Sequence, residues 1–261
     1  MELLQNAFNI ILYKPLFNAL VLLYQYLPGH DFGIAVIILT IIIRLILYPL
    51  MVQSIRSQKV VSELQPKIQE IQLKYKNDKE KLAKATMELY QKEKINPFGG
   101  CLPLLIQLPI LIALYQVFWK GLQPGAMVNL YSFVPSPGTI NPSFLGIINL
   151  SKSFIVKSLD TGGIIEYYWP VLFLAILTGI AQFIQTKMIT PKTKPQETKT
   201  FDSSQMIQKM LQKQMIYMLP VFTVYIVSIM PAAIGLYWMV TVLFSIIQQH
   251  LIYSKRSDVK L

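Results

Sequence analysis

The sequence predicts an all-α integral membrane protein with five transmembrane helices, an N-terminal interfacial amphipathic helix and a cytoplasmic helical hairpin. Two observations predict this class. The chain is 53% hydrophobic and only 14% charged, whereas soluble domains carry about a quarter charged residues. Its apolar residues also form long blocks, with Lys and Arg gathered between them. The net charge of +11 therefore fits basic membrane loops, and we expect no direct nucleic-acid recognition.

A membrane-spanning helix needs about 20 mainly apolar residues. Pro231 cannot continue a preceding helix, so it predicts a tight hairpin between the last two spans. The fourth span is short, about 22 Å long by the rise of an α-helix, so it either thins the bilayer or continues as a helix through 206–213. The five predicted spans are 33–52, 98–119, 164–186, 216–230 and 232–253.

The chain divides into an N-terminal amphipathic segment, 1–30, and a core, 31–261. Within the N-terminal segment, residues 6–28 are apolar but contain Lys14 followed by Pro15. A charge followed by a helix-breaking residue favours a helix lying in the membrane interface. A sixth span is the alternative.

The distribution of Lys and Arg predicts the orientation. Segments 53–97 and 187–213 and the tail after Tyr253 hold nineteen, whereas segment 120–163 and the N-terminal segment hold four. Because basic loops stay in the cytoplasm, we expect the N-terminus outside and the C-terminus in the cytoplasm. A sixth span would move only the N-terminus.

Residues 53–96, between the first two spans, predict a helical hairpin. Apolar residues recur at helical spacing on each side of a turn at 76–78, and Asn77 with Glu80 resembles a helix-start signal. The hairpin is either a solvated pair without special role or a basic docking arm for an incoming chain, a ribosome or anionic lipid. The first stripe is Leu64, Ile68, Ile71 and Tyr75, and the second is Leu82, Ala85 and Leu89.

Arg44 lies near the middle of the first predicted span. An arginine there costs about 2.5–3.5 kcal/mol on insertion scales, and it cannot lose its charge. No acidic residue lies deep in another span, because Glu166 is at an outer end beside Tyr167, Tyr168 and Trp169. We therefore expect Arg44 to face a water-filled cavity.

Polar residues in the spans support such a cavity. Thr40 and Tyr48 lie four residues from Arg44 and share its helical face. Each polar residue alone is more often a contact between helices, but together around a charge they favour a groove. The others are Gln107, Gln116, Thr178, Gln182, Gln185, Tyr237, Trp238, Thr241 and Ser245.

The residues argue against enzymatic chemistry. With a single cysteine, Cys101, the chain has no CxxC metal site or internal disulfide. The two histidines lie near predicted membrane edges, and no Ser/His, paired-Asp or HExxH arrangement occurs. We expect no enzyme activity, metal or cofactor.

Several motifs resemble the YidC/Oxa family of membrane protein insertases over residues 16–253. The resemblance rests on the combination of an intramembrane arginine, a hairpin and two long blocks, and this combination is highly specific. The matching stretches are IIIRLILYPL, LQPKIQEIQLKY, ELYQKEKINPFGGCLPLLIQLPILIALYQVF, PAAIGLYWMV and IIQQHLIY.

The resemblance implies a groove open to the cytoplasm and lipid, in which Arg44 attracts acidic residues of a substrate. It also implies that Gln185, with Gln182 as an alternative, and Trp238 face this groove. The predicted groove set is Arg44, Tyr48, Gln107, Gln182, Gln185 and Trp238. Implied partners are nascent membrane proteins and the lipid bilayer, with the Sec translocon and the ribosome as further candidates.

The predicted function is therefore a membrane protein insertase and chaperone of the bacterial cell membrane. The alternative is a small-solute transporter or anion channel, in which Arg44 would bind the solute. Transporters often contain repeated halves, and the sequence shows no internal repeat. The short tail after Tyr253 and the extended, Pro-rich 120–163 segment depart from the family pattern, and the short tail weakens the expectation of ribosome binding.

Overall fold

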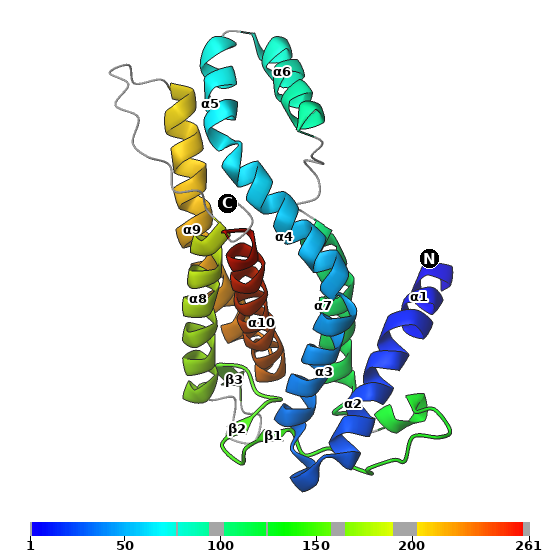
Figure 1. Ribbon diagram of the computed structural model, residues 1–261. Coiled ribbons are helices and arrows are strands. Elements are labelled where there is room, and N and C mark those ends of the chain that lie inside the picture. The colour runs from blue at the N-terminus through cyan, green and yellow to red at the C-terminus, as the bar shows by residue number, and fades with distance from the viewer. Residues whose placement is uncertain are drawn as a thin grey trace. The chain divides into compact units, whose positions relative to one another are not determined.

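The computed structural model describes residues 2–76, 78–93, 102–123, 125–157, 165–189 and 203–257, and most of them are helical (Figure 1). The chain forms two compact units. The first unit contains residues 1–47, 104–182 and 220–244, and the second contains 48–103, 183–219 and 245–261. Each unit is described by itself below.

The N-terminal helix runs through the Lys14–Pro15 pair instead of breaking there. Helix α1 (Glu2–Phe8) continues through a π-helical turn, η1 (Asn9–Tyr13), into α2 (Lys14–Tyr26). Pro15 lacks an N–H and its ring would clash with a carbonyl one turn earlier. The wider π turn, closed by the Lys14 N–H on Asn9 O, accommodates the ring without ending the helix.

The first predicted span, 33–52, is divided. Helix α3 (Phe32–Ile46) ends at Leu47, and α4 (Tyr48–Glu63) begins directly after it. Pro49 explains the division, because it has no N–H to donate to Leu45 O and its ring crowds that carbonyl group. Arg44 therefore lies in the last turn of α3 and not in the middle of a straight helix.

The remaining long helices are α7 (Leu102–Lys120), α8 (Trp169–Ile189), α9 (Ser203–Ile229) and α10 (Ala232–Ser257). Helix α9 continues to Ser203, as the alternative for the short fourth span, 216–230, predicted. The polar residues before Ile216 have good helix propensity, and a change in polarity does not end a helix. The apolar stretch itself, Ile216–Ile229, remains short, so thinning of the bilayer stays a prediction.

Among the residues that the structure describes, three helices are long and apolar enough to cross a membrane, or four if the bent pair α3 and α4 is one span. The three are 2–26, 169–189 and 232–254, and α7 and α9 contain shorter apolar stretches, Leu105–Lys120 and Ile216–Ile229. The described chain is thus a mostly helical, multi-pass membrane protein. Residues 2–26 satisfy the length and composition of a span, which keeps the sixth-span alternative open.

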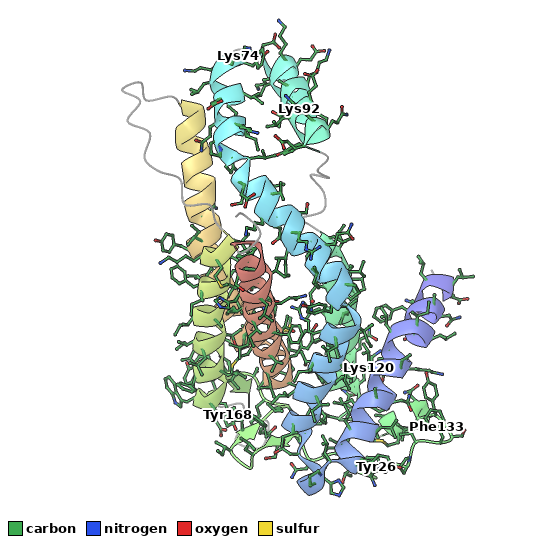
Figure 2. The ribbon with its side chains drawn as sticks, viewed as in Figure 1. Tyr26, Lys74, Lys92, Lys120, Phe133 and Tyr168 are labelled. Atoms are coloured by element: carbon green, nitrogen blue, oxygen red, sulfur yellow. The ribbon has the colours of Figure 1, made fainter. Side chains whose placement is uncertain are left out.

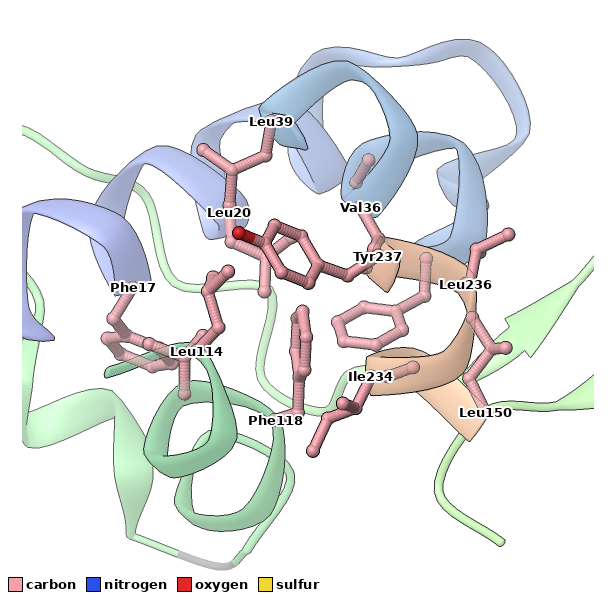
Figure 3. Close-up of a cluster of buried hydrophobic side chains, with 14 of the residues drawn as sticks. Phe17, Leu20, Val36, Leu39, Leu114, Phe118, Leu150, Ile234, Leu236 and Tyr237 are labelled. Carbon is pink, nitrogen blue, oxygen red and sulfur yellow. The ribbon is translucent and has the colours of Figure 1, made fainter. Parts of the chain in front are cut away.

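The first unit has one hydrophobic core, built from α2, α3, α7 and α10 (Figure 3). Phe17, Leu114 and Phe118 are each at most 2% exposed. Phe32 and Phe118 meet edge to face, with ring centroids 6.1 Å apart. Helices α8 and α9 also pack closely in this unit. A Cβ at Gly179 of α8 would lie 2.4 Å from Val224 Cγ2 of α9, so the small residue lets these two helices approach each other.

One end of the first unit is closed by a loop region that contains four short strands, which the all-α prediction lacked. Strands β1 (Ser143–Phe144) and β2 (Ile148–Asn149) pair antiparallel, as do β3 (Ile155–Lys157) and β4 (Ile165–Tyr167). These pairs are too short to give a period-2 pattern in the sequence. Because β4 occupies 165–167, α8 begins at Trp169 and not at the predicted 164.

Two side chains tie the loop region to the helices. Asp31 caps α3 by accepting from Ile34 N at 2.9 Å, and its other oxygen accepts from Leu145 N at 2.5 Å. Asn18 donates to Lys14 O and Asn129 O and accepts from Tyr131 N at 2.7 Å. The turn between α9 and α10 joins the same end, since Ala232 N donates to Lys152 O.

In the second unit, α5 (Gln65–Lys74) and α6 (Lys79–Lys92) pack side by side (Figure 1). The predicted helix start at Asn77 falls outside the described residues. The cap of α6 is Asp78, whose carboxylate accepts from Lys81 N at 3.0 Å. Asp78 suits this position because a short carboxylate reaches the free N–H groups of the first turn.

Candidate functional site

Arg44 is buried within the first unit, with 7% of its surface exposed. The end of α3 two residues later makes this position favourable for a cation. The last carbonyl groups of a helix carry partial negative charge, which stabilises a positive side chain in the last turn by about 0.3–1 kcal/mol. The break at Leu47 thus offsets part of the cost of placing an arginine among apolar helices.

Arg44 also has a partner inside the chain. Its guanidinium donates from Nη2 to the backbone carbonyl oxygen of Thr241 in α10, at 3.2 Å. A hydrogen bond from a charged donor contributes about 1.5–3 kcal/mol, comparable with the cost on insertion scales. The sequence predicted a water-filled cavity around Arg44, whereas the structure supplies a main-chain acceptor from another helix.

A second contact lies one turn away on α10. Gln107 of α7 donates from Nε2 to the hydroxyl of Tyr237, which is 3% exposed. Tyr237 is also an electrostatic neighbour of Arg44. Because Tyr237 and Thr241 are four residues apart, they lie on one face of α10.

These four residues form a polar cluster that joins three helices. We call Arg44, Gln107, Tyr237 and Thr241 the arginine cluster. Figure 3 shows the Tyr237 ring near the apolar side chains of Leu20, Val36 and Leu39. Such a cluster can hold one fixed positive charge at depth and offer donors to an anionic group, but it contains no nucleophile or general base.

The other predicted groove residues are placed differently. Gln182 in α8 and Trp238 in α10 are half-buried residues of the first unit. Tyr48 and Gln185 belong to the second unit, where Tyr48 is 37% exposed and its carbonyl accepts from Gln248 Nε2 at 3.5 Å. Of the predicted set, the arginine cluster contains Arg44 and Gln107.

Two of the polar residues in the spans form hydrogen bonds within their own helices. Thr40 Oγ1 donates to Val36 O at 2.6 Å, and Thr178 Oγ1 donates to Leu174 O at 2.7 Å. A hydroxyl bonded to the carbonyl one turn earlier is satisfied without a partner from another helix. These two contacts therefore add nothing to the polarity of a groove.

Sequence reasoning missed two sets of buried polar residues. Asn18 is 2% exposed in the first unit, and Gln248 and Gln249 are each 2% exposed in the second. The adjacent glutamines in the apolar stretch IIQQH were a visible signal, because amides in a span usually mark contacts between helices. Asn18 gave a weaker signal, since one asparagine in an interfacial helix is unremarkable.

The hairpin of the second unit carries a defined ion pair. Lys67 Nζ of α5 lies 2.7 Å from Glu93 Oε1 at the end of α6. The hydrogen bond and charge of Lys67 hold the pKa of Glu93 below its ordinary value. The Asp78 cap likewise has a lowered pKa, because its carboxylate accepts hydrogen bonds from Lys81. Both carboxylates are thus ionised at neutral pH.

Comparison with known proteins extends over nearly the whole chain. The model of the 60Kd inner membrane protein family matches residues 22–259. A membrane protein insertase YidC from Geobacter metallireducens is 35% identical over 92% of this chain. Relatives with the same name from Fusobacterium nucleatum subsp. nucleatum and Clostridium tetani are 34% and 35% identical over 86% and 81% of this chain.

The relatives differ in length. The chain spans 36% of the Geobacter protein, but 87% of the Fusobacterium protein and 76% of the Clostridium protein. All four residues of the arginine cluster lie inside the segment that the family model matches, residues 22–259. All three relatives are bacterial, which together with the apolar helices indicates a multi-pass bacterial membrane protein.

Proposed function

The chain belongs to the YidC/Oxa family, and from this premise we propose that it is an insertase that moves nascent transmembrane segments into the bilayer. The relatives are named for insertion rather than for covalent catalysis. The observation that carries the proposal is Arg44, a permanent charge buried at 7% exposure in a membrane helix. Intramembrane charges of this kind mark functional sites more often than structural ones.

We propose a bundle of five spans formed by the bent pair α3 and α4 together with α7, α8, α9 and α10. The N-terminus lies outside and the C-terminus in the cytoplasm, as the excess of Lys and Arg in 53–97 and 187–213 favours. The N-terminal helix lies in the interface, or it forms a sixth span that would place the N-terminus in the cytoplasm instead. The end of the first unit that holds β1–β4 then faces outward.

In this proposal the arginine cluster lines a groove that opens to the cytoplasm and to lipid. An acidic residue in the segment to be translocated is drawn toward Arg44 and released outward. At an effective dielectric constant of about 20, a charge pair at 4 Å gains about 4 kcal/mol before desolvation. That energy is sufficient to attract one carboxylate and small enough to let it leave.

The remaining groove residues and partners belong to the same proposal. Tyr48, Gln182, Gln185 and Trp238 contact the passing segment as further groove residues. The basic hairpin of α5 and α6 receives the incoming chain in the cytoplasm, where the Sec translocon and the ribosome are candidate partners. Its excess of Lys over Asp and Glu supports contact with an acidic surface.

The proposal is tested by complementation. A bacterium depleted of its own insertase is supplied with this chain, or with an Arg44→Ala or Arg44→Lys variant, and insertion of a single-span substrate with an acidic outer segment is followed by protease protection. We expect the intact chain to restore insertion, Arg44→Ala to lose it and Arg44→Lys to keep part of it, because lysine retains the charge but not the planar fork.

Failure of the intact, membrane-inserted chain to restore insertion contradicts the proposal. Proteoliposomes containing the purified chain provide the second arm, because a transporter or anion channel would take up small anions. Anion uptake that depends on Arg44, without insertion of the substrate, would favour that alternative.

A further inference from the structure

The loop region that closes the first unit is unusual in composition. From Gly121 to Ser151 the sequence contains no Asp, Glu, Lys, Arg or His. A water-exposed segment of this length would carry about eight charged residues at the usual share of about a quarter. Because it carries no charge, this loop can enter a membrane without the cost of burying charged side chains, which an ordinary aqueous loop would have to meet.

Residues 125–134, which we call the lateral loop, have two distinct sides. Ala126 and Val134 face the protein and are 8% and 6% exposed, whereas Val128 and Phe133 are 88% and 72% exposed. Two contacts fix the conformation of the loop around Phe133. Tyr131 N donates to Asn18 Oδ1 at 2.7 Å, and the Tyr131 ring stacks on the Phe133 ring with centroids 5.5 Å apart. Two large apolar side chains are thus held away from the core.

A second apolar tip occurs at the β1–β2 turn. Leu145 and Ile147 are 59% and 73% exposed, and Leu145 has a φ of +52° followed by Gly146 at +69°. Such turns in water favour Asn or Asp followed by Gly, because a larger side chain is strained at positive φ. A leucine at this exposed, strained position is better explained by an apolar surrounding than by water.

The position of the lateral loop along the helices is also consistent with contact with lipid. Tyr167 and Trp169, at the start of α8, are 55% and 65% exposed, and exposed aromatic residues at a helix end typically mark the membrane interface. Figure 2 shows Phe133 and Tyr168 at a similar height along the bundle. Phe133 therefore lies at the depth of the interface and not far out in the aqueous phase.

We propose that the lateral loop is a lipid anchor, with Val128 and Phe133 inserted at the boundary between headgroups and acyl chains and Leu145 and Ile147 as a second contact. The partner is the bilayer, because the exposed side chains continue the lipid-facing surface of the helices and carry no charge that would select a protein partner. Through Asn18, the anchor fixes α2 at one membrane surface. This inference requires only that the helices span a membrane, and it is independent of insertase activity.

The experiment places a fluorophore on the anchor. The lone cysteine is removed by Cys101→Ala, and Val128→Cys or Phe133→Cys is labelled with an environment-sensitive dye in the full chain in lipid nanodiscs. A label at Lys81→Cys on α6, where the lysine side chain is 70% exposed, is the aqueous control. Nanodiscs with and without lipids spin-labelled near the headgroup are compared.

We expect blue-shifted emission at both anchor positions and about twofold or stronger quenching by the spin-labelled lipids, with neither effect at the control, as for side chains in the membrane interface. Emission typical of water and quenching by aqueous iodide would overturn the proposal. Blue-shifted emission without quenching by lipid would also overturn it, because a second copy or another protein would then cover the loop. Two independent positions protect the result against a local folding defect.

Discussion

At the scale of single residues, Arg44 shows how backbone groups help a chain to hold a positive charge among apolar helices. The end of α3 supplies partial negative charge beside it, and Thr241 supplies a carbonyl acceptor from α10. Both groups stabilise the guanidinium in its charged form, which is the form that the proposed insertase function requires. The neighbouring contact between Gln107 and Tyr237 fixes the face of α10 on which Thr241 lies.

The Tyr237→Phe substitution tests this role. The variant keeps the ring and loses the hydroxyl that accepts from Gln107, and interhelical bonds in membrane proteins average about 0.6 kcal/mol. We expect a loss of about that size in unfolding experiments in detergent, with a larger relative loss of substrate insertion because the cluster is less well positioned. Tyr225→Phe is the matched control, since Tyr225 is 60% exposed. Equal effects of the two variants on insertion would contradict the positioning role.

Asn18 makes a second prediction at this scale. Its side chain satisfies Asn129 O and Tyr131 N, and Asn18→Ala leaves both without that partner. Each unsatisfied buried group costs about 1–3 kcal/mol, so we expect destabilisation of at least that size in thermal unfolding. Asn141→Ala, at an exposed residue of the same loop region, should be nearly neutral. A neutral Asn18→Ala would show that the loop is held by other contacts.

At the scale of elements, prolines decide where the helices change. Pro15 widens one turn of the N-terminal helix, and Pro49 divides the first predicted span. Both residues are visible in the sequence, but their outcomes differ. A π turn absorbs Pro15, whereas the helix is interrupted at Leu47, before Pro49. Which outcome occurs depends on packing of the flanking turns, and a sequence pattern does not contain that information.

The hairpin of α5 and α6 yields a prediction about pH. Glu93 has a lowered pKa because it accepts from Lys67, so the ion pair stabilises the hairpin above the ordinary carboxylate pKa and is lost as pH falls through the lowered value. NMR titration of the Glu93 carboxylate in the detergent-solubilised chain measures this pKa. Lys67→Met should raise the Glu93 pKa clearly, and Lys92→Met only slightly, because Lys92 contributes least. Identical pKa values in all three proteins would contradict the ion pair.

At the scale of the whole molecule, the helical membrane class and the family could be predicted from the sequence. Long apolar blocks and their basic flanks are local properties of the chain, and they suffice for that class. The partner of Arg44 could not be predicted, because a backbone carbonyl 197 positions away along the chain leaves no residue-type signal. The strands of the closing loop were missed for a similar reason, since two or three residues are too few for a period.

Helix α9 illustrates the same limit. Hydropathy located its apolar part at 216–230, but the helix extends to Ser203 because backbone hydrogen bonding continues where polarity changes. Gln107 was identified as a groove candidate by its residue type and position. Its contact with Tyr237 required the packing of α7 on α10.

The central claim is that Arg44 attracts acidic residues during insertion, and a charge exchange tests it most directly. Substrates that differ only by one Asp or one Lys in the translocated segment are inserted by the intact chain, by Arg44→Ala and by Arg44→Glu, each at equal abundance in the membrane. We predict faster insertion of the Asp substrate by the intact chain, no preference with Arg44→Ala and the opposite preference with Arg44→Glu. A preference for Asp that persists unchanged in both variants would contradict the account.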